Sequence, residues 1–272
     1  MGTALVTGAS AGIGLEFAWQ LATARHDLVL VARDRERLEH LAGQLRAAAG
    51  VRTEVLVADL SDRGDVDRVA ARLAAAERPV GLLINNAGYA PALPFVDDDL
   101  ASQEQALDVM VRVVMVLSHA AATAMRARGR GAILNVGSVA GLMATSAYSA
   151  HKAWVQTFTE ALAVELDGTG VTATCLRPGL TRTEFHDRAG VDVHAYPEIA
   201  WLDTESVVAC ALSDVRRGTV LSTPSLRYQT AATALKLLPR AAVRSLTHLR
   251  DAIVNPPDEH PDESPEDPAD PV

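Results

Sequence analysis

Six short apolar runs recur along this chain of 272 residues, and each ends abruptly in a polar residue or glycine. They are mostly apolar instead of alternating, which is typical of strands covered on both faces. Stretches with helical spacing of apolar residues separate them. This order predicts an α/β fold with a single doubly wound parallel sheet, Rossmann-like, and helices on both faces. The runs are residues 4–6, 27–32, 55–58, 82–84, 133–136 and 171–176.

The polar motifs that follow these runs are expected at one edge of the sheet. Parallel strands bring their carboxyl ends together, and open sheets of this kind bind ligands there. Residues 7–14 follow the first run and 85–88 the fourth, while Ser138 and Pro178 follow the fifth and sixth. This shared location is the strongest indication of a ligand site in the bare sequence.

The first of these motifs is Thr7-Gly8-Ala9-Ser10-Ala11-Gly12-Ile13-Gly14, and a helical pattern follows it. Glycine allows a sharp turn with positive φ and a close approach of the ligand. A helix N-terminus offers unpaired N–H groups and partial positive charge, which suit a diphosphate. The motif therefore predicts a dinucleotide diphosphate site; an ordinary glycine-containing turn is the alternative.

The second run ends in Ala32, and Arg33, Asp34 and Arg35 follow it. In dinucleotide folds this strand end faces the adenosine ribose, where an acid binds a free 2′-hydroxyl and an arginine suits a 2′-phosphate. Ala32 stands where the acid is expected, and the Arg33 guanidinium can bind a phosphate. The sequence therefore favours NADP(H), while Asp34 leaves NAD(H) open. The alternative is that Arg33 and Arg35 are surface charges at a helix start.

Tyr148 and Lys152 lie four residues apart, so that on a helix both side chains share one face. A free phenol titrates near pH ~10, too high for efficient proton exchange at neutral pH, and a nearby cation lowers that pKa. Ser138, ten residues before the tyrosine, can hold an oxygen-bearing substrate against the phenol. Most Tyr-x-x-x-Lys pairs are solvated helix faces, so the motifs around this pair decide its meaning.

Together these motifs resemble the short-chain dehydrogenase/reductase family over roughly residues 2–223. The family implies a Tyr general acid/base, a Lys that lowers its pKa and holds the nicotinamide ribose, and a Ser that fixes the substrate oxygen. The catalytic residues carried over are Ser138, Tyr148 and Lys152. The cofactor-binding residues are Gly8, Ser10, Gly12, Ile13, Gly14, Arg33, Asp59, Leu60, Asn86, Ala87, Gly88, Tyr148, Lys152, Pro178, Gly179, Thr181 and Thr183.

One residue departs from the family pattern. The family places an Asn in the helix after the Asn-Asn-Ala-Gly turn, where it helps to carry protons to the Lys. Aligned on residues 107–112, that position is Met110, and a thioether cannot relay a proton. A backbone carbonyl with a water, slow turnover or a different register are the open explanations.

Composition restricts the remaining classes. The chain has no uninterrupted apolar window of eighteen residues, starts directly with a strand, and carries only Cys175 and Cys210. We therefore expect no membrane span and no signal peptide, reduced thiols, no metal site and a cytoplasmic protein. Seven acids in residues 255–272 account for most of the net charge of −9, so that the rest is close to neutral and nucleic-acid binding is not expected.

The chain is expected to divide into a catalytic and cofactor-binding domain (1–224), a helical extension (225–254) and a disordered, acidic, Pro-rich tail (255–272). The extension has an apolar stripe with Pro239 as a break. It is expected to pack on the domain or on another subunit of a homo-oligomer. Peripheral membrane contact or a cover over the active site are the other interpretations.

The segment after Thr183 is rich in aromatic and aliphatic residues, which suits an apolar ketone or secondary alcohol as substrate. The sequence therefore predicts an NADP(H)-dependent oxidoreductase. Two alternatives stay open: a low-turnover dinucleotide-binding regulatory or redox-sensing protein of the same fold, and a subunit whose main role is assembly through residues 225–254.

Overall fold

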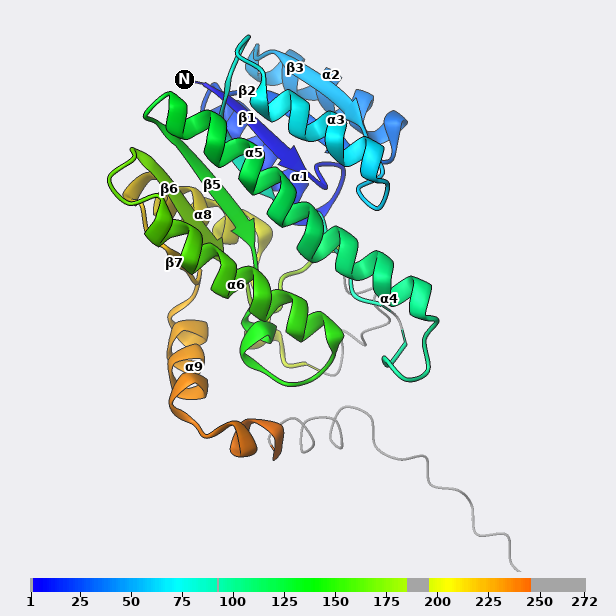
Figure 1. Ribbon diagram of the computed structural model, residues 1–272, viewed down its shortest axis with the longest axis vertical. Helices are drawn as coiled ribbons and strands as arrows, with labels where there is room; N and C mark the ends of the chain where they lie inside the picture. Colours follow the sequence, from blue (N-terminus) through cyan, green and yellow to red (C-terminus); the bar gives the residue numbers. More distant parts are fainter. Residues whose placement is uncertain (1, 92, 185–195, 246–272) are drawn as a thin grey trace, which may run out of the picture.

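The computed structural model describes residues 2–91, 93–184 and 196–245, and it contains a seven-stranded parallel sheet (Figure 1). All six expected strands are present, and a two-residue strand near residue 221 adds an edge that the sequence did not predict. In spatial order the strands are β3 (Thr53–Val57), β2 (Asp27–Ala32), β1 (Thr3–Thr7), β4 (Val80–Asn85), β5 (Gly131–Val136), β6 (Val171–Leu176) and β7 (Leu221–Ser222).

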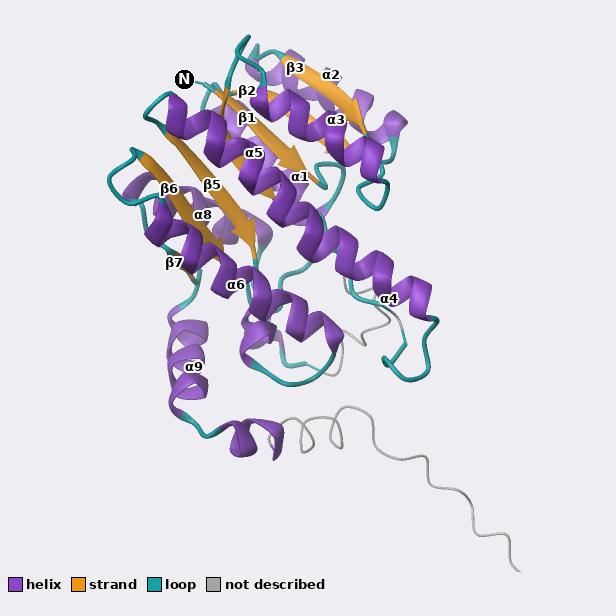
Figure 2. Ribbon diagram, viewed as in Figure 1, coloured by secondary structure: helices purple, strands orange, loops and turns teal. Residues whose placement is uncertain are grey.

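Helices cover both faces of the sheet, which confirms the predicted doubly wound architecture (Figure 2). One face carries α1 (Gly12–Thr23), α2 (Arg35–Ala49) and α8 (Thr204–Arg217), and the other carries α3 (Arg63–Ala74), α5 (Val113–Ala127) and α6 (Ala147–Glu165). Val6 and Leu30 point into the first layer, whereas Leu5 and Val29 point into the second. Both faces of a strand are buried, which is why the runs are mostly apolar.

The helix starts around the sheet are set by side-chain caps. Asp34, Asp62 and Asp203 accept hydrogen bonds from backbone N–H groups in the first turns of α2, α3 and α8. Such caps satisfy N–H groups that have no partner within the helix. No side chain caps α1, whose first turn follows the Gly-rich loop, so its N–H groups stay available to a ligand.

A continuous helical run over Leu100–Ala127 joins α4 (Leu100–Leu107), the π-helical turn η1 (Asp108–Arg112) and α5. By length and composition alone it could cross a membrane, with a hydropathy of 1.5 in its most apolar window. Core helices meet the same criterion, and 44% of this window is buried inside the protein. Because α5 packs against α3 and the sheet, the run serves as a core helix in this fold.

The expected helical extension begins with α9 (Leu226–Leu237), which leaves the sheet beyond β7 (Figure 1). The helix ends at Leu237, two residues before Pro239, the predicted break, and helical backbone resumes over 240–245. The predicted disordered tail (255–272) and the end of the extension lie outside the described residues. So does most of the aromatic segment after Thr183.

Candidate active site

The Gly-rich loop connects β1 to α1 at the carboxyl edge of the sheet. Gly8 and Gly12 have φ of +65° and +53°, a backbone conformation that favours glycine. A Cβ at Gly12 would stand 3.2 Å from the Thr183 side chain. Ser10 and Ile13 are only partly buried beside them. Together with the uncapped start of α1, these residues fit the diphosphate of a dinucleotide.

Gly14 differs from the other two glycines of this motif. It is buried, and a Cβ there would lie 2.2 Å from the Gly8 carbonyl oxygen and 2.4 Å from the Asn86 amide nitrogen. No side chain fits at that distance, so Gly14 lets α1 pack directly on the loop. Its role here is close packing, which supports the diphosphate site from below.

Thr7 joins the ends of β1 and β4, a role that the sequence reasoning missed. Its buried hydroxyl donates to the Ile84 carbonyl at 3.3 Å and accepts from the backbone N–H groups of Asn86 (2.9 Å) and Ala87 (3.0 Å). The Asn86 side chain donates to the Thr7 carbonyl at 3.0 Å and the Gly8 carbonyl at 3.3 Å. Asn86 and Ala87 therefore hold the Gly-rich loop against the sheet.

The predicted adenosine-side residues lie at the ends of β2 and β3. Arg33 is exposed, and its charge contributes to lowering the pKa of Asp59, after hydrogen bonds from Ser61. Asp34 is engaged elsewhere, because it caps α2 and pairs with Arg37 at 3.5 Å. Since Asp34 already has these partners, the exposed Arg33 is the freer of the two adjacent residues to meet a ribose substituent. Buried Leu60 follows Asp59, as expected for an apolar neighbour of an adenine.

Arg37 is a further residue on this side that the sequence reasoning missed. Its guanidinium approaches Glu184 at 3.4 Å as well as Asp34, so it connects the start of α2 to the chain that follows Thr183. All three side chains are about half exposed, and exposed pairs of this kind contribute little to stability. The contact therefore marks proximity between the adenosine side and residues 183–184.

Ser138, Tyr148 and Lys152 converge at the end of β5. Ser138 begins a 3₁₀ turn, η2 (Val139–Leu142), and caps it by accepting from the Ala140 N–H at 3.1 Å. The Ser138 side chain also forms a hydrogen bond with the Tyr148 side chain. The Lys152 Nζ donates to the Val136 carbonyl at 2.7 Å and lies 5.6 Å from the centroid of the Tyr148 ring. Tyr148 and Lys152 lie one turn apart on α6, and both side chains contact the end of β5 and the residue Ser138 that follows it.

Burial dominates the titration of both groups. It raises the pKa of Tyr148 to about 12, against a smaller lowering by the Ser138 hydrogen bond. It lowers the pKa of Lys152 to about 8, since an ammonium is costly to bury. Burial thus opposes the lowering of the Tyr148 pKa that the family resemblance leads us to expect from Lys152. The spacing of Tyr148 and Lys152 in the sequence indicates a neighbouring cation, but it does not indicate that the phenol is buried away from water.

The lowered pKa of Lys152 predicts how the stability of the protein depends on pH. The Lys152 pKa is lower in the folded protein than its ordinary 10.5, so between pH 8 and 10 the unfolded chain binds more protons. The unfolding free energy of the wild type, relative to Lys152→Met, is therefore expected to rise by about 2 kcal/mol from pH 7 to pH 10. Denaturant unfolding of both variants at each pH measures the difference, in which other titrations common to both cancel. A difference that is flat or falls with pH would contradict the burial of the ammonium.

Met110 occupies the predicted position beside the lysine. A Cβ at Gly88 would lie 3.4 Å from the Met110 Cγ and 3.7 Å from the Lys152 Nζ, so both side chains lie beside this glycine. This position agrees with the register of the alignment. Met110 is buried in the π-helical turn η1, a local irregularity that is frequent at functional sites and that the sequence reasoning did not predict.

The segment 178–183, called the roof segment below, runs from the end of β6 to the Gly-rich loop. The Val139 N–H donates to the Pro178 carbonyl at 3.1 Å, which ties the segment to the turn after Ser138. At its other end Thr183 reaches Gly12. Thr181 is buried between them and donates to the Gly179 carbonyl at 3.1 Å. The four roof residues named for cofactor binding thus span from the serine to the diphosphate loop.

A buried chain of side-chain hydrogen bonds lies beneath the site. The Asn85 amide donates to Asn135 at 2.9 Å and to Ser118 at 3.2 Å, and the Asn135 amide donates to Thr159 at 3.0 Å. It joins β4, β5, α5 and α6, so the strand ends that carry the site cannot shift independently. Only the polarity of the two asparagines in otherwise apolar strands could have signalled it.

Metal chemistry has no visible support among the described residues. No group of three His, Cys, Asp or Glu side chains there could hold a metal ion, and Cys175 and Cys210 are free thiols. Cys175 is buried in β6, where it packs as an apolar residue.

Known proteins with similar sequences support an oxidoreductase. The family model for short chain dehydrogenase matches residues 2–192. A galactitol 2-dehydrogenase (L-tagatose-forming) from Cereibacter sphaeroides is 35% identical over 238 residues, which cover 84% of this chain and 91% of that protein.

Solved structures agree with the fold and the cofactor class. A short-chain dehydrogenase from Sphingobium yanoikuyae in complex with NADPH matches with a TM-score of 0.80 and 37% identity, covering 87% of this chain and 94% of that one. The bulky-bulky ketone specific alcohol dehydrogenase from Comamonas testosteroni matches with a TM-score of 0.76 and 31% identity, covering 89% and 96%.

The fold, the site and these similarities define a dinucleotide-dependent oxidoreductase. The chain belongs to the short-chain dehydrogenase/reductase family.

Proposed function

We propose that the protein is an NADP(H)-dependent carbonyl reductase or alcohol dehydrogenase that acts on apolar ketones or secondary alcohols. The observation that carries the proposal is the convergence of Ser138, Tyr148 and Lys152 beside Gly88 and next to the roof segment. A panel of apolar ketones with NADPH, followed by the loss of absorbance at the reduced nicotinamide band, tests it. Oxidation of NADPH that depends on the ketone is expected.

The chain's residues divide the work of this reaction. Gly8, Ser10, Gly12, Ile13 and the start of α1 hold the diphosphate, while Gly14 and Asn86 support that loop. Arg33, Asp59, Leu60 and Ala87 line the adenosine side, and Gly88 lies beside Lys152, where the nicotinamide ribose is expected. Pro178, Gly179, Thr181 and Thr183 bind the nicotinamide end. When bound, the reduced cofactor supplies the hydride for the carbonyl carbon.

The proton comes from the chain itself. The Ser138 hydroxyl positions the carbonyl oxygen, and the Tyr148 hydroxyl donates its proton to that oxygen as it becomes an alkoxide; in the reverse direction Tyr148 accepts the proton. Lys152 stabilises the negative charge that this leaves on the phenol oxygen. Burial of the phenol opposes its ionisation, so the favourable contacts with Ser138 and Lys152 are needed for turnover.

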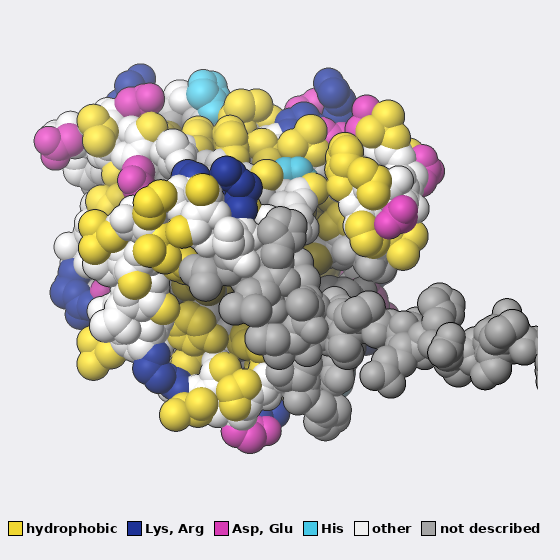
Figure 3. Space-filling model, turned by 90° about the horizontal axis from the view of Figure 1, so that it is seen from below, with side chains coloured by type: hydrophobic (Ala, Val, Ile, Leu, Met, Phe, Trp, Pro, Cys, Tyr) yellow, Lys and Arg dark blue, Asp and Glu magenta, His cyan; other side chains and the backbone are white. Residues whose placement is uncertain are grey.

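An apolar substrate is favoured by apolar side chains beside the Ser138 turn and in the loop after β4. Leu142 and Met143 are partly exposed beside the Ser138 turn. Leu93, Phe95 and Val96, in the loop after β4, are more than half exposed. Figure 3 shows hydrophobic side chains gathered widely over this lower face of the molecule. The ketone-specific relative agrees with this choice, whereas the galactitol dehydrogenase makes a polyol the competing substrate class for the same screen.

NADPH preference is expected to depend on Arg33. Its exposed guanidinium at the end of β2 can bind the extra phosphate of NADPH, which NADH lacks. Arg33→Ala should therefore raise the Kd of NADPH about tenfold or more and change the Kd of NADH less than about twofold. Fluorescence titration measures both constants, and Arg35→Ala, also exposed, is the matched control. An equal loss for the two cofactors would mean that Arg33 does not recognise that phosphate.

A low-turnover dinucleotide-binding regulatory or redox-sensing protein is the alternative. The observation in its favour is Met110, whose thioether lies beside Lys152 and cannot carry a proton. The complete set of Ser138, Tyr148 and Lys152 favours the enzyme. Steady turnover over many cycles with any ketone would decide for the enzyme, and NADPH binding without turnover for the sensor.

The remaining expectations concern the cellular setting. We keep a cytoplasmic homo-oligomer with a separate extension (225–254) as our proposal. Leu107, Met115 and Val164 are large exposed side chains on α4, α5 and α6, and they are available to a subunit contact. Light scattering coupled to size-exclusion chromatography would give the subunit number.

A further inference from the structure

Helix α9 contacts the roof segment through one aromatic side chain. The ring of Tyr228 lies against Gly179, where a Cβ would stand 2.1 Å from the Tyr228 Cζ. The φ of Gly179 is not in the positive range that favours glycine. Glycine is therefore required at this position by the tyrosine ring rather than by the backbone.

The Tyr228 hydroxyl joins two backbone segments. The Leu180 N–H donates to it at 3.1 Å, and it donates to the Ala200 carbonyl at 2.8 Å. Beside it the Leu202 N–H donates to the Leu180 carbonyl at 2.8 Å, and the Arg182 N–H donates to the Leu202 carbonyl at 3.1 Å. The hydroxyl thus adds one more hydrogen-bonded step to a short parallel ladder between residues 180–182 and 200–202.

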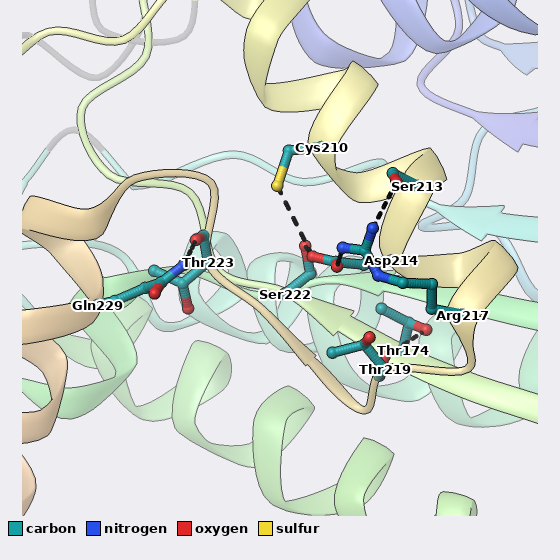
Figure 4. A network of polar contacts seen from close by, with 9 residues as sticks. All are labelled: Thr174, Cys210, Ser213, Asp214, Arg217, Thr219, Ser222, Thr223 and Gln229. Atoms are coloured by element: carbon teal, nitrogen blue, oxygen red, sulfur yellow. Dashed lines mark hydrogen bonds and ion pairs between the residues drawn. The ribbon is translucent and has the colours of Figure 1, made fainter.

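Hydrogen bonds hold the start of α9, which carries Tyr228, against the sheet. The next residue, Gln229, donates through its side-chain amide to the Thr223 carbonyl at 2.8 Å (Figure 4). Buried Arg177 donates to the Thr223 hydroxyl at 2.8 Å. In the same network the Ser222 hydroxyl donates to buried Asp214 at 2.6 Å. These contacts fix the start of α9 to the ends of β6 and β7 and so fix the position from which Tyr228 reaches the roof.

The extension also contacts the turn that follows Ser138. The Arg240 guanidinium donates to the Leu142 carbonyl at 3.1 Å, at the end of the turn that Ser138 begins. The residues after β7 therefore touch both the roof segment and the catalytic turn. This arrangement supports the interpretation that the extension packs over the active site.

From these contacts we infer that Tyr228 is a positioning residue for catalysis. Its hydroxyl connects residues 180–182 to residues 200–202 and thereby fixes the position of the roof segment. In that position the roof segment orients the nicotinamide toward Tyr148. The inference rests on the proposed function, because the roof matters for rate only if a carbonyl is reduced beneath it.

Hydrogen exchange tests the structural half of this inference without any turnover. Tyr228→Phe keeps the ring on Gly179 but removes the hydroxyl, while the Arg182 and Leu202 amides keep their own acceptors. Their exchange is expected to accelerate at least about fivefold, the scale of one lost hydrogen bond. Arg227 is an exposed neighbour of Tyr228 on α9, so Arg227→Ala is the control. In this variant the Arg182 and Leu202 amides should exchange at the wild-type rate. Unchanged exchange at both amides in Tyr228→Phe would overturn the inference.

Kinetics test the functional half. In Tyr228→Phe the single-turnover rate of NADPH oxidation by a reducible ketone should fall about fivefold or more, while the Kd of NADPH changes less than about twofold, since the Gly-rich loop is untouched. Faster exchange with an unchanged single-turnover rate would also overturn the inference. A wild-type chain that neither binds NADPH nor oxidises it would reject the proposed function, which is a different result from unchanged exchange.

A double-mutant cycle checks the contact itself. Gly179→Ala should lower the midpoint of unfolding in the wild-type background, because the new methyl group displaces the Tyr228 ring. In the Tyr228→Ala background the same change should lower it much less, since the ring is gone. Equal effects in both backgrounds would show that Tyr228 does not occupy this position.

Discussion

Replacement of Tyr148 by Phe is expected to lower kcat by at least about 100-fold, the usual scale for losing acid–base assistance. The phenyl ring keeps the packing of the α6 face, but the hydroxyl that forms a hydrogen bond with Ser138 is lost. In the proposed arrangement Ser138 only positions the carbonyl oxygen, so without the phenol water would have to supply the proton. Steady-state kinetics with the best ketone from the screen measures the effect.

The controls separate chemistry from binding. The Kd of NADPH in Tyr148→Phe should stay within about threefold of the wild type, because we expect the Gly-rich loop to supply most of the binding free energy. Tyr89→Phe is the matched variant: its hydroxyl donates to Gln105 at 3.2 Å on α4 instead of to Ser138. Near-native turnover in Tyr148→Phe, or an equal loss in Tyr89→Phe, would reject Tyr148 as the acid.

The second large effect is expected for Gly14→Ala. The methyl group would stand 2.2 Å from the Gly8 carbonyl oxygen, a backbone atom that cannot rotate away. Helix α1 must therefore move off the loop, with a loss of unfolding free energy of about 3 kcal/mol, as in overpacked cores. Affinity for NADPH should fall at least about tenfold, because the same movement disturbs the diphosphate site.

Gly43→Ala is the matched control for this substitution. Gly43 lies within α2, and a Cβ there would have nothing within 4 Å. Since alanine favours helix over glycine, this variant should gain about 0.5–1 kcal/mol and bind NADPH as the wild type does. Denaturant unfolding and fluorescence titration give both quantities. If Gly14→Ala has the same unfolding free energy and NADPH affinity as Gly43→Ala, α1 does not pack closely on the loop.

Regular patterns in the sequence were sufficient for the fold. Six of the seven strands, the doubly wound layers and the Gly-rich loop followed from runs and spacings that are local in the chain. The helix that carries Tyr148 and Lys152 was assumed from their four-residue spacing, and α6 has them one turn apart. The edge strand β7 was missed because two residues carry no periodicity.

Contacts between distant segments decided the rest. The role of Thr7 depends on residues 79 and 80 positions away, and that of Tyr228 on residues 48 and 28 away. The pKa of Tyr148 depends on how much water the folded chain removes from the phenol. The sequence by itself determined which side chains reach the carboxyl edge of the sheet, since spacing and strand periodicity are local. Only the tertiary structure decided what surrounds them there, because burial and long-range hydrogen bonds exist only after the chain has packed.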